Sequence, residues 1–320
     1  MTESAVQIPV VDLRGETATT DLDHAWRNVG FVSVVGHGIG QSHFEEMRSL
    51  LVELFALGDA VKRRYRITPD NYRGFIPLGF FTPNRGEVTG TTPDAYEAFK
   101  LHWECPDGHP ALTACPLYGR NRWVPEVDRM AEVVSRYWSA CDSLGRTLLD
   151  AVASSLGVHG TTLHAMFDAP LTNMTLMHYP AMPPGADFGI HPHRDTNIFT
   201  LLHPDPVGGL QVQDRDGEWI TVACPPDAMV VNVGEMLELL SGGHFVATPH
   251  RVVNLGPDRY SFPYFMVPDH DVVVEPLVLP RPGFKAASMP VGELTNEVWR
   301  TNWPDELPSE SDYALGSLGR

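Results

Sequence analysis

The sequence is poor in cysteine and in long apolar runs, and each shortage excludes a class of protein. Its 320 residues include 4 Cys, and no two of them lie in a CxxC pair or at zinc-ligand spacing. We therefore expect free thiols in a reducing cytosol rather than a disulfide framework. No uncharged apolar run is long enough to cross a bilayer, and residues 1–13 lack the basic and apolar segments of a signal peptide. These absences predict a cytoplasmic protein.

Basic residues are also scarce. Lys and Arg together number 23 against 40 Asp and Glu, which gives a formal net charge of −17. A surface this acidic repels phosphate backbones and anionic lipid, so it argues against nucleic-acid and membrane-surface binding. A small anionic substrate is still compatible with this charge, because a local basic pocket can outweigh the overall field. The hydrophobic share of 43% and the charged share of 20% are those of a globular protein and exclude wholesale disorder.

The first half of the chain has the pattern of helices with two short strands. The apolar runs 8–13 and 31–35 predict strands. Apolar residues at helical spacing predict one helix that ends at Gly58 and a longer helix that runs from about Pro125 to Gly157. We expect the apolar stripe of the longer helix to pack on a sheet.

From about residue 171 the pattern changes to short β-prone runs that alternate with Gly, Pro and Asp turns. Many short strands at this spacing are typical of a sandwich or barrel, for which a jelly roll is the natural choice. The runs are 173–179, 198–202, 209–213, 219–222, 229–233, 250–254 and 260–267. We therefore predict an α+β fold, mainly β, with a double-stranded β-helix (jelly roll) core flanked by N-terminal helices.

These patterns divide the chain into three predicted parts. Residues 1–165 form an N-terminal helical or α+β region, and residues 166–280 form the jelly-roll domain. Residues 281–320 are rich in proline and acidic side chains. We expect this tail to pack on the core or to be partly frayed.

Candidate metal ligands lie in the β-rich half. Side chains two residues apart in a strand share a face, so His193 and Asp195 can point into one cavity. His250 opens a later strand and can supply a second imidazole. Two histidines and one carboxylate that leave other coordination positions open form the facial triad of non-haem Fe(II) oxygenases. Alone the pattern is weak, because the chain has 14 His and a histidine in a β-rich core is more often a hydrogen-bonding residue than a ligand.

Three further polar residues fit the binding of a carboxylate. Arg259 and Ser261 are again two residues apart, and the guanidinium can grip a carboxylate through two parallel hydrogen bonds while the hydroxyl adds a third. Tyr179 alternates in phase with Met177 and Thr175, so its hydroxyl can reach the same carboxylate if that face points inward. The competing interpretations are a surface arginine beside a strand serine, and a core tyrosine with a polar tip.

Eight stretches match one known family in order and with similar spacing. Those of the second half are HRDTNIFTLL (193–202), GGLQV (208–212), VVNVGEM (230–236), TPHRV (248–252) and RYS (259–261); those of the first half are IPVVDL (8–13), GF with GHGI (30–39) and YRGFIP (72–77). On these residues the sequence resembles the 2-oxoglutarate- and Fe(II)-dependent dioxygenases, specifically the isopenicillin N synthase-like branch. The resemblance spans roughly residues 7 to 275.

The resemblance implies roles for the candidate residues. His193, Asp195 and His250 would bind Fe(II), while Arg259 and Ser261, assisted by Tyr179, would hold the distal carboxylate of 2-oxoglutarate. The implied enzyme also consumes O2 and releases succinate and CO2 as it hydroxylates, desaturates or cyclises a small molecule. The branch suggests a secondary metabolite or an amino-acid derivative as substrate, and a monomer or weak homodimer.

Residues that depart from the family pattern include His203, Pro204, Phe80 and Phe81, and one departure concerns the co-substrate. Plant-type members often have an Asn two residues before the tyrosine, where this chain has Met177. The substitution removes one polar contact to the co-substrate. It leaves the predicted iron ligands unchanged.

Three alternatives remain at this point. An oxidase like isopenicillin N synthase or aminocyclopropane carboxylate oxidase would use Fe(II) and O2 without 2-oxoglutarate, and it carries the same Arg-x-Ser pair; succinate formation distinguishes it. A zinc hydrolase can also use two histidines and an aspartate, but it lacks a nearby general base and gives Arg259 and Ser261 no role. A non-enzymatic jelly-roll binding module would not need Asp195.

Overall fold

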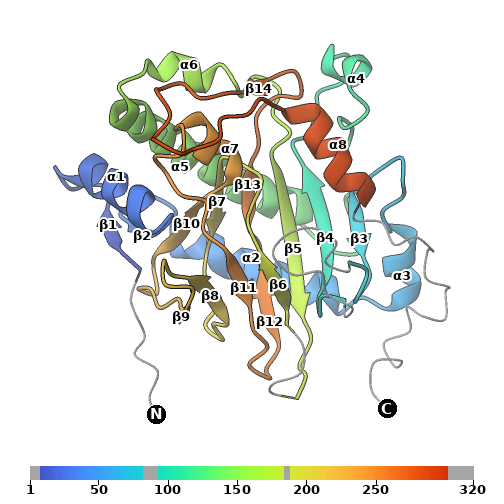
Figure 1. The fold of residues 1–320 in the computed structure, drawn as a ribbon. Helices are drawn as coiled ribbons and strands as arrows, with labels where there is room; N and C mark the ends of the chain where they lie inside the picture. The colour runs from blue at the N-terminus through green and yellow to red at the C-terminus, as the bar shows by residue number, and fades with distance from the viewer. Residues whose placement is uncertain (1–7, 82–92, 184–187, 302–320) are drawn as a thin grey trace.

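Two β-sheets face each other in the computed structural model, which describes residues 8–81, 93–183 and 188–301 (Figure 1). In the described residues the larger sheet has the strand order β1-β2-β10-β7-β13-β5-β4-β3, and β12 also pairs with β5. Its strands are β1 (Val10–Asp12), β2 (Phe31–Val35), β3 (Gly74–Ile76), β4 (Glu97–His102), β5 (Asn173–Tyr179), β7 (Phe199–Leu202), β10 (Met229–Val233), β12 (Arg259–Ser261) and β13 (Tyr264–Met266).

The smaller sheet has the order β6-β11-β8-β9. Its strands are β6 (Ile190–His193), β8 (Leu210–Gln213), β9 (Trp219–Thr221) and β11 (His250–Val252), and a separate short pair joins β14 (Val273–Val274) to β15 (Met289–Pro290). The two sheets form the jelly-roll core that the short-strand pattern predicts, so the expected α+β, mainly β fold is confirmed.

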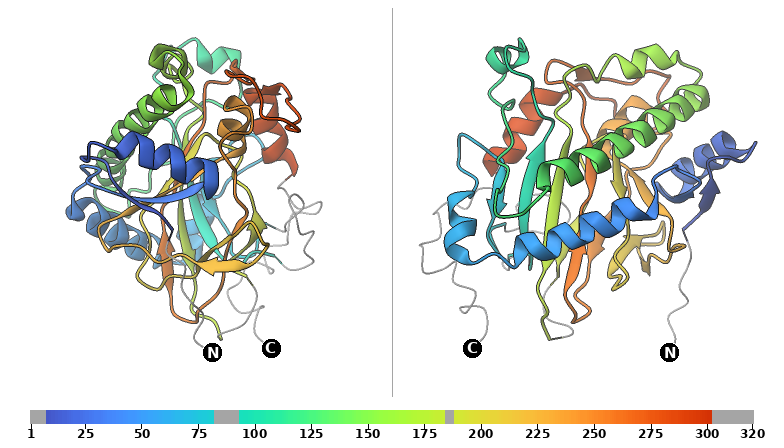
Figure 2. Two further views of the ribbon diagram at one scale, coloured as in Figure 1. Left: turned by 60° about the vertical axis from the view of Figure 1, so that its left-hand side comes forward. Right: turned by 180° about the vertical axis from the view of Figure 1, so that it is seen from behind.

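The helices of the described residues are α1 (Ala18–Asn28), α2 (Gln41–Phe55), α3 (Asp59–Arg64), α4 (Ala111–Ala114), α5 (Met130–Leu156), α6 (Gly160–His164), α7 (Glu235–Leu240) and α8 (Val291–Thr301). The outer face of the larger sheet is covered by α1, α2 and α5 (Figure 2), whereas α7 packs against β14 and α8 against β15. The helices α2 and α5 lie side by side across that face, and α1 packs against α5 and β2. The apolar stripe of α5 thus packs on a sheet, as predicted.

The ends of the predicted elements differ from the structure in two places. The long helix begins at Met130 rather than near Pro125, because Arg129 has a left-handed backbone (φ 58°) that interrupts a regular helix. The predicted run 260–267 is two strands, β12 and β13, since Pro263 lies between them and has no N–H to donate to a sheet. Both strands still pair with β5.

The sheet and the helices share one apolar core. The ring of Trp26 in α1 lies 5.3 Å from that of Phe199 in β7 and 5.4 Å from that of Phe245, measured between centroids. Gly145 lets α5 approach the sheet closely, since a Cβ there would lie 2.9 Å from Met266 Sδ of β13. The larger sheet combines strands from both sides of residue 165. The division of the chain into parts at residues 165 and 280 stays a prediction.

No helix within the described ranges is both long and apolar enough to cross a membrane. The four cysteines are free thiols, and three of them are buried.

Gly30, before β2, provides a test of the core's packing. Its φ is +71°, and a Cβ there would lie 2.0 Å from the carbonyl oxygen of Val246. We expect Gly30→Ala to lower the free energy of unfolding by at least about 2 kcal/mol, because it adds a clash to the strain of a left-handed residue. Gly38→Ala is the matched control, since Gly38 has φ +80° with nothing within 4 Å of its Cβ position. If urea unfolding showed equal losses of unfolding free energy in Gly30→Ala and Gly38→Ala, the clash would be contradicted.

Candidate metal centre and co-substrate site

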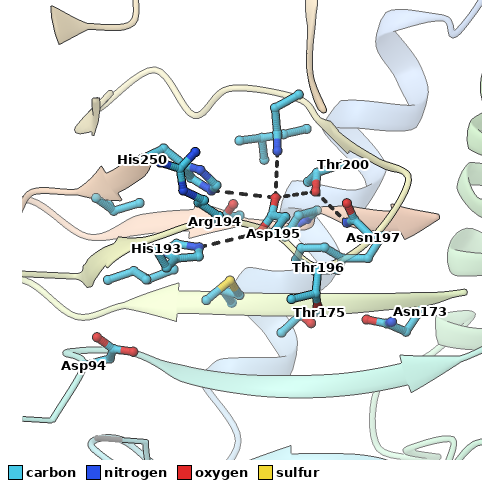
Figure 3. Close-up of a pocket in the computed structure, with 18 of the residues that line it drawn as sticks. Asp94, Asn173, Thr175, His193, Arg194, Asp195, Thr196, Asn197, Thr200 and His250 are labelled. Carbon is cyan, nitrogen blue, oxygen red and sulfur yellow. Dashed lines mark hydrogen bonds and ion pairs between the residues drawn. The ribbon is translucent and has the colours of Figure 1, made fainter. Parts of the chain in front are cut away.

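A cavity of about 720 Å³ lies between the two sheets, and its wall includes side chains of α8. Figure 3 shows part of this wall. The six site residues predicted from the sequence all line the cavity: Tyr179, His193, Asp195, His250, Arg259 and Ser261. The sheets therefore bring together residues that are up to 82 positions apart (261 − 179) in the chain.

Strand pairing sets the two candidate histidine ligands against each other. His193 is the last residue of β6 and His250 the first of β11; they are direct partners in the antiparallel register, with imidazole centroids 4.3 Å apart. Asp195 lies between them: its Oδ1 is 3.6 Å from His193 Nε2, and its Oδ2 is 3.7 Å from His250 Nε2. One donor atom from each residue lies within 4.8 Å of the others. This spacing suits three ligands of one ion.

The route by which Asp195 reaches the cavity differs from the prediction. The alternation of a strand was the reason to place His193 and Asp195 on one face, but β6 ends at His193 and Asp195 belongs to the following loop. That loop is fixed by backbone hydrogen bonding, because the Asp195 carbonyl accepts from Glu235 N (2.8 Å). The two side chains therefore converge through a loop rather than through strand pleating.

Hydrogen bonds fix the tautomer of both imidazoles. His193 Nδ1 donates to the carbonyl oxygen of His191 (2.8 Å), and His250 Nδ1 donates to that of Thr248 (3.2 Å). A carbonyl oxygen only accepts, so the proton of each neutral ring resides on Nδ1. Each Nε2 then presents its lone pair toward Asp195, as a metal ligand requires.

Two neutral side chains hold the Asp195 carboxylate in place. Its Oδ2 accepts hydrogen bonds from Thr200 Oγ1 (2.5 Å) and from Asn232 Nδ2 (2.8 Å), and Asn197 Nδ2 in turn donates to Thr200 Oγ1 (2.8 Å) (Figure 3). Sequence reasoning did not assign roles to these partners. The available signal was a polar residue inside an otherwise apolar buried strand, Asn232 in β10 and Thr200 in β7.

The protonation states of the three residues suit a divalent cation. Burial raises the pKa of Asp195, but the two imidazoles and the Thr200 hydrogen bond outweigh burial and hold the pKa well below its ordinary value. Burial lowers the pKa of His250 to about 4. Burial also lowers the pKa of His193, but the hydrogen bond and charge of Asp195 leave it raised overall. The cavity thus offers an ionised carboxylate beside two imidazoles, a donor set that fits Fe(II).

A second part of the wall fits a carboxylate ligand. Arg259 and Ser261 of β12 are paired with Tyr179 and Met177 of β5. Arg259 is 5% exposed; its Nε donates to the carbonyl oxygen of Gly208 (2.7 Å), and its guanidinium lies over the Tyr179 ring at 4.7 Å. Its Nη1 is buried with no hydrogen-bond partner among the described residues. A carboxylate would satisfy this donor, so the residues present fit 2-oxoglutarate.

The Tyr179 hydroxyl lies beside Met177, the residue that stands where plant-type family members often have Asn. It donates to Met177 Sδ at 3.6 Å, and sulfur is a weak acceptor. Burial raises the pKa of Tyr179 to about 12, so the hydroxyl keeps its proton at neutral pH. A stronger acceptor, such as a carboxylate oxygen, can therefore compete for this donor.

Sequence reasoning assigned no role to Asp94 and Lys100, which are among the charged residues of the cavity wall. Asp94 Oδ1 accepts from both the backbone N (3.1 Å) and the ring Nδ1 (2.7 Å) of His191, next to the metal centre. Lys100 lies in β4, in the half of the chain that was assigned no chemistry. The signal for Lys100 was a lysine within a strand whose other residues are all buried.

A jelly roll whose cavity holds two imidazoles and one carboxylate defines the class of non-haem Fe(II) oxygenases. Comparison with known proteins agrees with this class. The family described as the 2OG-Fe(II) oxygenase superfamily matches residues 171–268, and the family described as the N-terminal region of non-haem dioxygenases in morphine synthesis matches residues 8–126.

Individual relatives and structures give the same result. The chain is 32% identical over 267 residues to the homoarginine-6-hydroxylase 2-ODD-C23.1 of Arabidopsis thaliana, covering 80% of this chain and 78% of the relative. It is 30% identical over 301 residues to the 2-oxoglutarate-dependent dioxygenase citB of Monascus ruber, covering 86% and 89%. A full-length Neurospora crassa protein, crystallised with alpha-KG and thymine, has the same fold, with a TM-score of 0.79, 22% identity and coverage of 95% and 99%. The chain belongs to the 2OG-Fe(II) oxygenase superfamily.

Family membership decides between the alternatives that the sequence left open. The protein is an Fe(II)- and 2-oxoglutarate-dependent oxygenase, an oxidoreductase with O2 as co-substrate, and it acts on small molecules. The family and the relatives carry the requirement for 2-oxoglutarate, which disfavours the oxidase that dispenses with it. They equally disfavour a zinc hydrolase and a non-enzymatic binding module.

Proposed function

We propose that His193, Asp195 and His250 hold the Fe(II), and that Arg259 and Ser261, assisted by Tyr179, hold the distal carboxylate of 2-oxoglutarate. The observation that carries this assignment is the pairing of two features in one cavity. Three donor atoms lie within 4.8 Å of one another, and a buried guanidinium Nη1 lacks a partner in the part of the chain that the structure describes. Together they account for both ends of the co-substrate.

The bound Fe(II) and 2-oxoglutarate supply the oxidation of the substrate by O2, with release of succinate and CO2. The protein's own residues orient the reactants. Asp195 supplies one negative charge, and Thr200 and Asn232 keep its carboxylate from rotating. Arg259 fixes the co-substrate through a charge-assisted contact whose geometry is set by its bond to Gly208. The apolar side chains of the cavity limit the access of water to the centre.

We propose hydroxylation of a small amino-acid derivative or secondary metabolite as the reaction. The name of the Arabidopsis relative, a homoarginine-6-hydroxylase, supports this class of reaction and substrate. The cavity of about 720 Å³ suits a small molecule bound next to the co-substrate. The net charge of −17 argues against a nucleic-acid partner.

The assembly and the compartment are part of the same proposal. One chain supplies all six site residues, which supports a monomer or weak homodimer. Four free thiols, three of them buried, support a reducing cytoplasm.

Succinate formation tests the proposed function directly. We expect the protein to convert 2-oxoglutarate to succinate in the presence of Fe(II) and O2, and a substrate to gain the mass of one oxygen atom. Protein loaded with Zn(II) is the control and forms no succinate. Hydrolysis products with Zn(II), or substrate oxidation without consumption of 2-oxoglutarate, would contradict the proposal.

A further inference from the structure

Lys100 brings a positive charge into the cavity wall away from Arg259. It is the strand partner of Thr175 in the pairing of β4 with β5. Its Nζ donates to Asn173 Oδ1 (2.7 Å) and to Thr175 Oγ1 (2.8 Å), and lies 5.2 Å from the ring centroid of Phe265. All four side chains line the cavity. The ammonium is therefore positioned by two neutral oxygens and one aromatic ring.

No carboxylate of the described ranges lies within ion-pair distance of Lys100 Nζ. The contrast is the buried Lys62, whose Nζ lies 2.9 Å from Glu97 Oε2. An ammonium has three N–H donors, and Lys100 uses two of them on Asn173 and Thr175. Burial lowers the pKa of Lys100 to about 7. Asp195 acts on this ammonium only at longer range, so a half-buried ammonium without an ion-pair partner is left, and an anion would complete its surroundings.

The position of Lys100 separates it from the 2-oxoglutarate contacts. Along β5, Tyr179 is opposite Arg259 and Thr175 is opposite Lys100. Four residues of a strand span roughly 13 Å. Figure 3 shows Thr175 and Asn173 on the Thr196 side of Asp195, with His193 on the other side. A 2-oxoglutarate bound at Arg259 and at the metal has no carboxylate left for Lys100.

We propose that Lys100, Asn173 and Thr175 form a subsite for a carboxylate of the substrate that is oxidised, so that the substrate class is a small organic acid. The inference rests on the proposed function, because it assigns the other end of the cavity to 2-oxoglutarate. The third N–H of Lys100 and the hydroxyl proton of Thr175 are available to the carboxylate. Phe265 and the neighbouring apolar wall contact the body of the acid.

Matched pairs of probes test the subsite. Phenylacetate, cinnamate and octanoate are each compared with their primary amides on protein loaded with Mn(II) and saturating 2-oxoglutarate. Dissociation constants come from calorimetry, and stimulation of succinate release is measured separately with Fe(II). We expect at least one acid to bind about 10- to 100-fold more tightly than its amide, since a hydrogen bond to a charged group has about this effect. If no acid binds better than its amide, the proposal is wrong.

Two variants test whether Lys100 causes the preference for an acid over its amide. Lys100→Met should abolish the preference for the acid, and 2-oxoglutarate affinity should change by less than about twofold because its contacts lie elsewhere. Asn173→Asp should also abolish it, because the near-isosteric change places a carboxylate beside Nζ, and the fold keeps its stability. The exposed Lys285→Met is the control.

The outcomes separate this inference from the proposed function. A wild-type protein that forms succinate but has no preference for acids overturns the subsite alone. A wild-type protein that forms no succinate from 2-oxoglutarate overturns the proposed function. Loss of 2-oxoglutarate affinity in Lys100→Met would assign Lys100 to the co-substrate and contradict the subsite.

Discussion

Asp195→Asn is expected to abolish 2-oxoglutarate turnover while leaving the protein folded. In the wild type, Thr200 and Asn232 both donate hydrogen bonds to Asp195 Oδ2. The change keeps the shape of the side chain and one oxygen that can accept these bonds. It removes the single negative charge of the centre. Loss of a partner outside the ligand set lowers metal affinity or activity about 10- to 100-fold, so loss of a ligand should exceed about 100-fold. Succinate release and a Fe(II) titration measure the two effects.

A second His–Asp pair provides the control for that variant. His164 Nε2 lies 2.7 Å from Asp150 Oδ1 on the helical side of the molecule, away from the cavity. Asp150→Asn also removes a carboxylate from a histidine, and it should change neither Fe(II) affinity nor turnover. If Asp195→Asn behaved like Asp150→Asn, the assignment of Asp195 as a ligand would be untenable.

Arg259→Ala is expected to raise the KM for 2-oxoglutarate on the order of 100-fold, because a hydrogen-bonded charge pair is lost. Fe(II) affinity should stay within about twofold, since the triad does not depend on the guanidinium. Arg259→Lys keeps the charge but cannot reproduce the planar two-bond grip, so its KM should lie between those of the wild type and of Arg259→Ala. Initial rates at varied 2-oxoglutarate give KM, and metal titration gives the affinity.

An exposed arginine provides the control that separates the loss of the 2-oxoglutarate contact from a general effect of removing an arginine. Arg120, which pairs with Glu104 and Asp107 at the surface, is replaced by alanine and should leave the KM unchanged. Thermal unfolding checks that Arg259→Ala is folded, because Arg259 Nε also bonds to the Gly208 carbonyl. Equal losses of Fe(II) and 2-oxoglutarate affinity in Arg259→Ala would count against a specific carboxylate contact.

Local patterns were sufficient to predict the secondary structure around the site. The runs 31–35, 173–179 and 229–233 are strands with the predicted ends, β2, β5 and β10, because alternation and flanking turns are local properties of the chain. The start of α5 was not predicted, since the left-handed conformation of Arg129 depends on how the preceding turns pack. The split between β12 and β13 could have been read from Pro263.

The candidate ligands were recognisable from the sequence because their order matches a known family, whereas their supports were not. Thr200 and Asn232 are adjacent to Asp195 only through the pairing of β7 with β10 and the loop after β6. Lys100 enters the cavity through the pairing of β4 with β5, which joins residues 75 positions apart (175 − 100). Long-range register of this kind is not determined by local spacing, so the charge distribution of the cavity required the structure.

Anaerobic titration of the Fe(II) protein with 2-oxoglutarate tests the central claim most directly, because the chelate of a keto acid on ferrous iron has a weak visible charge-transfer band. The account predicts that this band appears in the wild type and saturates at one 2-oxoglutarate per Fe(II)-loaded chain, and that it is absent in Asp195→Asn. A wild-type protein that binds Fe(II) without developing the band, or a band of equal strength in Asp195→Asn, would contradict it.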